Sequence, residues 1–152
     1  MDLTLPFDYA AISQILLHRY PFLLVDRITE YEVDKRIVGI KNVSLNERFL
    51  SIGADGSHVL PPTILTEAVA QVGAIMILAK PENRQRLPFF AGIQRVRYRR
   101  AVRPGDVVVI EVFALRLRNK MGRLKGTAKV DGKIVLEGTM TFALGDPKEP
   151  AE

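Results

Sequence analysis

The sequence contains no cysteine and no tryptophan, and histidine occurs only at His18 and His58. The absence of cysteine excludes disulfides, thiolate metal sites and a cysteine nucleophile, and it fits a reducing, cytoplasmic location. Two histidines far apart in the chain give no metal-ligand spacing, so we expect neither a metal nor a cofactor. The first six residues have no basic start and no apolar run, so no signal peptide is expected.

Long apolar runs are scarce as well, because only residues 61–79 approach the length that crosses a bilayer. This run begins with two prolines, which suit a helix start because the first N–H groups of a helix are unpaired there. It also contains Glu67 and Gln71. We therefore predict a helix that is apolar nearly all round and buried inside the domain, and no membrane span.

The rest of the chain shows short alternating segments separated by turn residues, which is typical of an antiparallel sheet. The composition favours a single domain over residues 1–152, with a frayed tail at 145–152. A short helix capped by Asp8 is expected at 9–17 and a loop at 44–59. The expected strands cover residues 22–32, 36–43, 88–98, 107–117, 123–130 and 133–144. The predicted fold is α+β, a curved sheet wrapped round the helix, and its exposed edges favour a dimer or larger oligomer.

A set of short motifs stands in order along residues 12–144. They are HRYPFLLVDR at 18–27, KNV at 41–43 with NE at 46–47, EAVAQ at 67–71, AGI at 91–93, YRRAVRPGD at 98–106 and VDG at 130–132. Together they resemble the short 3-hydroxyacyl-acyl-carrier-protein dehydratases. The resemblance implies a hot-dog fold and a homodimer with active sites at the subunit interface, often assembled further into a hexamer as a trimer of dimers. It also implies a 3-hydroxyacyl thioester substrate carried on acyl carrier protein.

The resemblance further implies a set of catalytic groups. Relatives use a histidine base in a Gly-His-Phe-Pro-Gly loop, fourteen residues before a helix glutamate that acts on the hydroxyl side. The glycine N–H of a Met-Pro-Gly-Val segment binds the thioester carbonyl. Glu67 matches the glutamate, although it could instead be a structural residue satisfied by a local partner such as Gln71.

Two of these groups are missing at the matching positions. Gly53 stands fourteen residues before Glu67 where the histidine would be, and Pro62 replaces the glycine. Proline has no N–H, so the carbonyl donor is lost together with the base. Losing one such donor typically costs on the order of 100- to 1000-fold in rate, so we expect weak or altered lyase activity.

Other residues could take part in the site. His58 would serve as a substitute base if its loop refolded, and otherwise anchors the loop or lies on the surface. Asp55 is interpreted as a turn residue, and family analogy makes His18 structural. The substrate-binding candidates are Gly53, Pro62, Thr63 and Gln71. Two alternatives stay open: a thioesterase that uses Glu67 with the N–H of Thr63, and a non-catalytic partner subunit of an intact dehydratase.

Positive charge is concentrated in one part of the chain. Residues 84–129 hold thirteen lysines and arginines and only two acidic residues. Arg95, Arg97 and Arg99 alternate, which predicts one face of a strand. Such a face can simply be solvated, or it can steer an acidic acyl carrier protein; a coenzyme A thioester is the other carrier that fits. The chain offers no stacked aromatics, so we do not expect nucleic acid as a partner.

Overall fold

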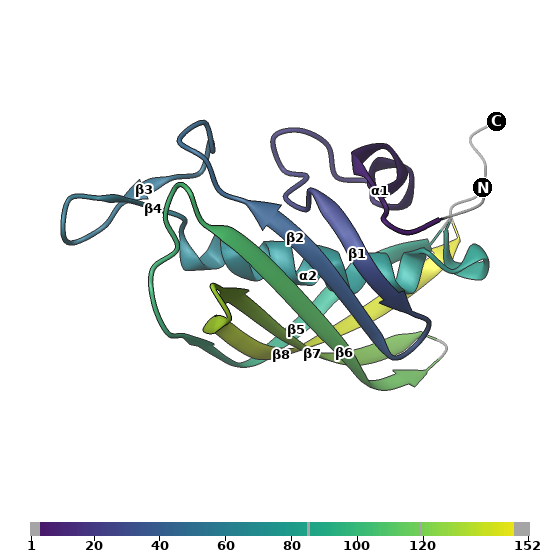
Figure 1. Ribbon diagram of the computed structural model, residues 1–152. Coiled ribbons are helices and arrows are strands. Elements are labelled where there is room, and N and C mark those ends of the chain that lie inside the picture. Colours follow the sequence, from purple (N-terminus) through teal and green to yellow (C-terminus); the bar gives the residue numbers. More distant parts are fainter. Residues whose placement is uncertain (1–3, 85, 119, 148–152) are drawn as a thin grey trace.

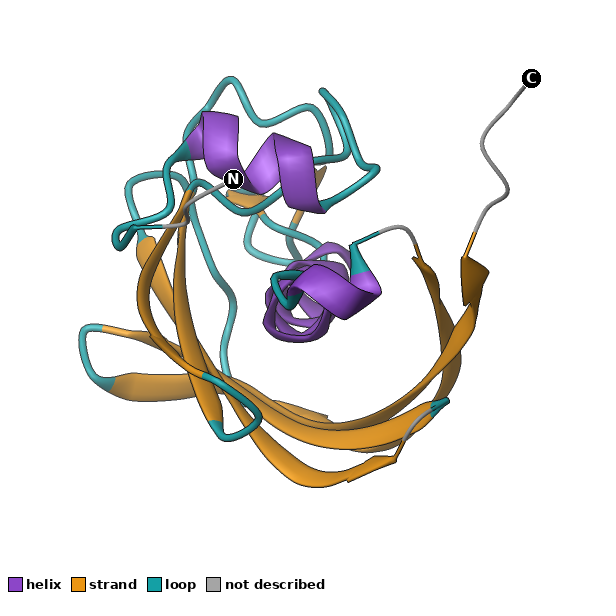
Figure 2. Cartoon of the chain, turned by 90° about the vertical axis from the view of Figure 1, so that its right-hand side faces the viewer, coloured by secondary structure: helices purple, strands orange, loops and turns teal. Residues whose placement is uncertain are grey.

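The computed structural model describes residues 4–84, 86–118 and 120–147. One strongly curved sheet wraps round the long helix, and the short helix lies outside (Figures 1 and 2). The main sheet is antiparallel and has the strand order β1-β2-β6-β7-β8-β5, while β3 and β4 form a separate small hairpin. The elements are α1 (Tyr9–Ile15), β1 (Arg27–Glu32), β2 (Arg36–Asn42), β3 (Ser51–Ile52), β4 (His58–Val59), α2 (Pro62–Leu78), the 3-10 turn η1 (Pro81–Asn83), β5 (Arg86–Tyr98), β6 (Val107–Arg118), β7 (Met121–Val130) and β8 (Lys133–Pro147). This confirms the predicted α+β hot-dog fold.

The long helix α2 lies where the sequence predicted it. Pro61 occupies the N-cap and Pro62 the first helical position, where the missing N–H costs nothing. Most of its apolar side chains are buried, including Val69, Val72 and Ile75. In the part of the chain that the structure describes, no helix is both long enough and apolar enough to span a membrane.

Small residues let α2 approach the sheet closely. A Cβ atom built on Gly126 of β7 would lie 2.4 Å from Val69 Cγ1, and one built on Gly73 of α2 would lie 2.7 Å from Leu124 Cδ1. Real Cβ atoms essentially never come that close, so a larger residue at either position would force Val69 or Leu124 to shift. The helix is therefore held at a fixed depth inside the curved sheet.

The predicted first strand, 22–32, is wrong over residues 22–26. The strand β1 begins only at Arg27, because the Leu24 N–H and the Phe22 carbonyl bond the Gln71 side chain, and the Asp26 N–H makes the first contact with β2, at the Ile40 carbonyl. The predicted helix at 9–17 ends at Ile15 but is capped by the Asp8 side chain, as expected. The 44–59 loop contains the two short strands β3 and β4, which are too brief to give a sequence pattern.

The two edges of the main sheet differ. Beside β1, the N-terminal segment adds a short antiparallel bridge, in which Phe7 and Ile28 exchange both backbone hydrogen bonds. At the other edge, β5 exposes Phe89, Phe90 and Ile93. The last strand continues to Pro147, so the expectation of a frayed tail from residue 145 is wrong for 145–147; residues 148–152 lie outside the described part.

Candidate active site

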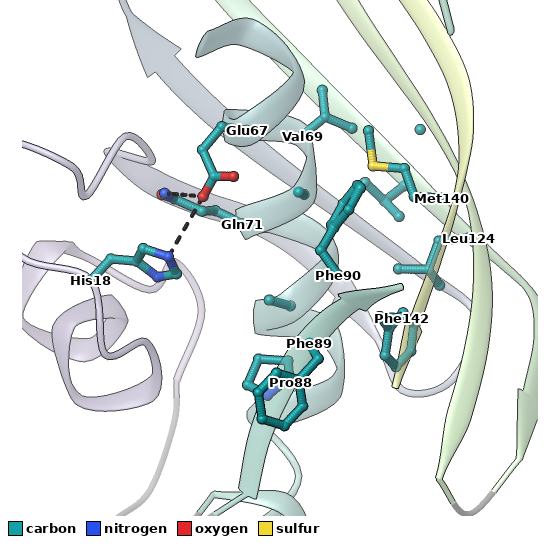
Figure 3. Close-up of a pocket in the computed structure, with 14 residues that line it drawn as sticks. His18, Glu67, Val69, Gln71, Pro88, Phe89, Phe90, Leu124, Met140 and Phe142 are labelled. Atoms are coloured by element: carbon teal, nitrogen blue, oxygen red, sulfur yellow. Dashed lines mark hydrogen bonds and ion pairs between the residues drawn. The ribbon is translucent and has the colours of Figure 1, made fainter. Parts of the chain in front are cut away.

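An apolar pocket lies between α2, the start of β5 and the inner face of the sheet (Figure 3). Ala70 and Ala74 of α2 leave room along one side of the helix because their side chains are small. The sheet and β5 contribute large apolar side chains: Phe89, Phe90, Leu124, Met140 and Phe142. Three polar side chains border the pocket, namely His18, Glu67 and Gln71. The pocket thus pairs an apolar interior with a carboxylate, a combination suited to an acyl chain with a reactive head group.

Glu67 is held by two side chains on one of its oxygens. Gln71, one turn further along α2, donates from Nε2 to Glu67 Oε1 at 2.9 Å. The Nε2 atom of His18 lies 3.5 Å from the same oxygen and forms an ion pair with it when the imidazole is protonated. Among the described residues, no hydrogen bond or ion pair reaches Glu67 Oε2, which is therefore available to a ligand.

Gln71 is almost completely buried and serves as a connector. Its Oε1 accepts from the Leu24 N–H at 2.9 Å, and its Nε2 donates to the Phe22 carbonyl at 2.8 Å. The 18–27 motif is thereby fastened to α2, and the Glu67 carboxylate receives a fixed orientation. Gln71 lines the pocket, but its hydrogen-bonding groups are already occupied by the protein.

The sequence did not predict that His18 lies beside Glu67, because family analogy indicated a structural role for this histidine. Its ring packs against Phe22 with a centroid distance of 5.9 Å, and Phe22 packs in turn against Phe49. The side chain is one-third exposed and lies at the edge of the pocket. Its motif could have suggested this position only if the fold that brings residues 18–27 to α2 had been known.

The β3–β4 hairpin carries Gly53 and His58 and projects beyond the start of α2 (Figure 1). Neither residue lines the pocket within the described chain. The hairpin turn is held by Asp55, whose Oδ1 accepts from Ser57 Oγ at 2.6 Å and whose Oδ2 lies 2.8 Å from Arg103 Nη2. The hydrogen bonds from Ser57 and then the Arg103 guanidinium lower the pKa of Asp55 to about 2. Asp55 is thus a turn residue, as predicted, with a cross-link to the 98–106 motif.

The start of α2 borders a second groove, which adjoins the pocket and shares Glu67, Ala70 and Phe90 with it. The N–H groups of Ile64 and Leu65 both donate to the Pro61 carbonyl, at 3.0 and 3.1 Å. Thr63 lies in this groove, while Pro62 is exposed beside it. No acceptor for the Thr63 N–H is found in the described part of the chain.

The alternation predicted for Arg95, Arg97 and Arg99 is interrupted between Arg95 and Arg97. The pairing of β5 with β8 shifts between Gln94 and Arg97, and Arg95 adopts a positive φ of 53° in the resulting bulge. Arg99 forms an ion pair with Glu137, which lies opposite Arg97 in the sheet. The positive charge of this segment is therefore partly neutralised by Glu137 of β8.

A family match and similar curated proteins both relate this chain to one group of proteins. Residues 16–139 match the FabA-like domain family. The chain is 50% identical over 138 residues to a 3-hydroxyacyl-[acyl-carrier-protein] dehydratase FabZ of Caldicellulosiruptor saccharolyticus, covering 91% of this chain and 99% of that protein. It is 53% identical over 138 residues to the FabZ of Bacillus cytotoxicus, covering 91% and 96%.

Solved structures share the fold at lower identity. The dehydratase heterocomplex ApeI:P from Xenorhabdus doucetiae is similar with a TM-score of 0.78 and 22% identity, covering 95% of this chain and 93% of that chain. A Streptococcus mutans protein bound to acetyl CoA is similar with a TM-score of 0.66 and 12% identity, covering 88% and 98%. With a family match over most of its length and relatives at half identity, this chain belongs to the FabA-like family and is a homologue of the FabZ dehydratases.

Proposed function

We propose that this protein binds an acyl group carried as a thioester, with the acyl chain in the apolar pocket and the thioester beside Glu67. The observation that carries the proposal is the oriented Glu67 carboxylate, which borders, with His18 and Gln71, a cavity that is otherwise apolar. Oε2 of Glu67 is available to the ligand, while Oε1 is occupied by Gln71. The FabZ relatives are named for a 3-hydroxyacyl carrier substrate, which supports the same ligand class.

We further propose that dehydration by this protein is slow. Elimination needs a base at C2 and a donor for the carbonyl oxygen, and these are the groups that Gly53 and Pro62 cannot supply. Each is typically worth about 100-fold or more in rate. We expect dehydration of a 3-hydroxyacyl thioester at least about 100-fold below the rate of an intact FabZ.

Restoring the missing groups tests this proposal. A Cβ on Gly53 would lie 3.1 Å from Asp55 Oδ1 and 3.2 Å from Val59 Cγ1, so Gly53→His alone would be crowded by the present loop. The better variant replaces residues 52–56 with Gly-His-Phe-Pro-Gly and adds Pro62→Gly. Elimination should rise by about 100-fold or more, and Glu67→Gln in the same background should abolish the gain. A rapid wild-type reaction would refute the proposal, and His58→Ala would then be the first variant to examine.

We propose that a second subunit pairs along the edge of β5. This strand is long, lies at the open edge of the sheet and exposes Phe89, Phe90 and Ile93. The pairing would bring the partner's β3–β4 hairpin toward Glu67, and a trimer of such dimers is the expected larger assembly. Sedimentation should give a dimer or hexamer; a monomer at micromolar concentration would contradict the interfacial site.

A mixed dimer with an intact dehydratase is the second candidate function. It is favoured by the same open edge and by the likeness to a dehydratase heterocomplex. Co-expression with a FabZ from the same organism should then give a stable complex. In that complex, Glu67→Gln of this chain should lower the rate, because the partner's histidine loop would act with Glu67.

The carrier is proposed to be acyl carrier protein, with Arg95, Arg97 and Arg99 contributing to docking. Since Arg99 is paired with Glu137, charge reversal at Arg95 and Arg97 is the more direct test. Binding should weaken with rising ionic strength and weaken further in the double Glu variant. If the carrier protein fails to bind while acyl-coenzyme A binds, coenzyme A is the carrier. Thiol release from either ligand, lost in Glu67→Gln, would support the thioesterase alternative.

A further inference from the structure

The hydroxyl groups of Thr66 and Tyr98 form a pair beside Glu67. Thr66 Oγ1 lies 2.7 Å from Tyr98 Oη, which joins α2 to the end of β5. We propose that this hydroxyl pair binds the carbonyl oxygen of the acyl thioester, in place of the backbone donor that Pro62 removes. The inference rests on the proposed function, because it assigns the head-group contact of the same ligand.

The position of the pair fits a head group whose chain fills the pocket. Thr66 and Tyr98 line the groove at the start of α2, and Glu67, Ala70 and Phe90 line both this groove and the pocket. The two cavities therefore adjoin each other at the carboxylate. With the acyl chain in the pocket, the thioester carbonyl would lie in the adjoining groove, next to the hydroxyl pair.

The protons of the pair can turn toward a ligand. Thr66 has one hydroxyl proton, and its Oγ1 lies 2.8 Å from the Pro62 carbonyl, so in the empty groove Thr66 donates there and Tyr98 donates to Thr66. When a carbonyl arrives, Thr66 can donate to Tyr98 Oη and Tyr98 can donate to the ligand. The Pro62 carbonyl remains satisfied, because α-helix geometry supplies the N–H four residues further on.

Thr66 and Tyr98 differ in how far they are buried, and this gives them different roles in the proposed contact. Thr66 is 6% exposed and is fixed on the helix, whereas Tyr98 is 47% exposed and presents its hydroxyl to the groove. The apolar groove walls formed by Ala70, Phe90 and Ile93 strengthen a hydrogen bond made there relative to one in water. A tyrosine hydroxyl is among the groups that proteins use as carbonyl donors.

The test compares two ligands that differ only at the carbonyl. Calorimetry would measure the binding of S-hexanoyl-coenzyme A and of S-hexyl-coenzyme A, the thioether with CH₂ in place of C=O. The unchanged protein should bind the thioester about 5- to 10-fold more tightly, the effect of one neutral hydrogen bond. Tyr98→Phe should bind both ligands at the thioether level, while Tyr20→Phe, at an exposed tyrosine outside the groove, should change neither.

Variants of Thr66 provide a second test of the hydroxyl pair. Thr66→Ser keeps the hydroxyl and should keep the preference for the thioester, whereas Thr66→Val should reduce it. If Thr66→Val fails to fold, Tyr98→Phe still decides, because Tyr98 is half exposed and circular dichroism can verify its fold.

The possible outcomes distinguish failure of the hydroxyl-pair assignment from failure of the acyl-binding proposal. Equal binding of thioester and thioether by the unchanged protein, or a full thioester preference in Tyr98→Phe, overturns the hydroxyl-pair assignment and leaves the acyl-binding proposal intact. Binding of neither ligand overturns the acyl-coenzyme A form of that proposal. The same comparison on acyl and alkyl carrier protein then decides between a change of carrier and loss of both proposals.

Discussion

The side-chain oxygen of Gln71 accepts a hydrogen bond from the backbone N–H of Leu24 at 2.9 Å, in a fully buried contact between residues distant in the chain. A strand would ordinarily satisfy that N–H, so Gln71 takes the place of a strand for this segment. The same side chain orients Glu67. Stability and site geometry therefore depend on one amide group.

Gln71→Leu should accordingly destabilise the protein strongly. The change leaves the buried Leu24 N–H and the part-buried Phe22 carbonyl without their partner, and a buried unsatisfied group costs about 1–3 kcal/mol. We expect the free energy of unfolding in urea to fall by about 1–4 kcal/mol. Glu67→Gln is the matched control, because its amide oxygen still accepts from Gln71. A loss below about 0.5 kcal/mol in Gln71→Leu would argue against this connecting role.

Gly126→Ala tests the close approach of α2 to the sheet. The added methyl group would meet Val69 Cγ1 at 2.4 Å, an overpacking that typically costs about 1–3 kcal/mol. Gly92→Ala on β5 is the control for packing within one subunit, since its methyl group would meet nothing of the same chain within 4 Å. Adding Val69→Ala to Gly126→Ala should recover part of the loss in thermal unfolding. Equal effects of the two alanine variants would show that backbone entropy, rather than packing, dominates.

The Asp55 turn should show a specific acid dependence. Because the pKa of Asp55 is lowered to about 2, its hydrogen bonds stabilise the folded hairpin above the ordinary carboxyl pKa and are lost as the pH falls through about 2. Carboxyl ¹³C NMR should follow this titration. Ser57→Ala should raise the pKa of Asp55 more than Arg103→Gln does, since the Ser57 Oγ hydrogen bond that it removes is the largest single cause of the lowered pKa. The reverse ranking would make the guanidinium the main contributor.

Tyr31 provides a test at the opposite end of the pH scale. Its hydroxyl donates to the Met76 carbonyl at 3.1 Å, and burial, followed by the charges of Asp34 and Glu82, raises its pKa to about 12. The neutral form is thus favoured by folding, and this contribution is lost as the pH rises from about 10 to about 12. Ultraviolet absorbance of phenolate should show a late-titrating group that Tyr31→Phe removes. Titration of that group near pH 10 would indicate that the hydroxyl is accessible.

The sequence predicted features that depend on local patterns. The proline-led apolar run gave α2, and turn residues between alternating segments gave most strands of the sheet. Residues 22–26 were assigned wrongly because their continuous apolar run resembles a strand, while the Leu24 N–H and the Phe22 carbonyl bond the Gln71 side chain, far away in the sequence. Glu67 could be placed by its motif. His18 and the Thr66–Tyr98 pair could not, because only the folded chain brings them beside Glu67.

The bridge between Phe7 and Ile28 has a consequence for how far this protein can assemble by strand addition. It occupies backbone groups at one border of the sheet, where β1 also carries the charged side chains Glu30 and Glu32 and a register shift. Charge, irregular pairing and a covering segment each discourage the addition of a further strand. A sheet blocked at one border can join a second copy once, at β5, and the joined sheet then ends in two blocked borders. The covered border at β1 therefore disfavours open-ended, fibre-like assembly by strand addition.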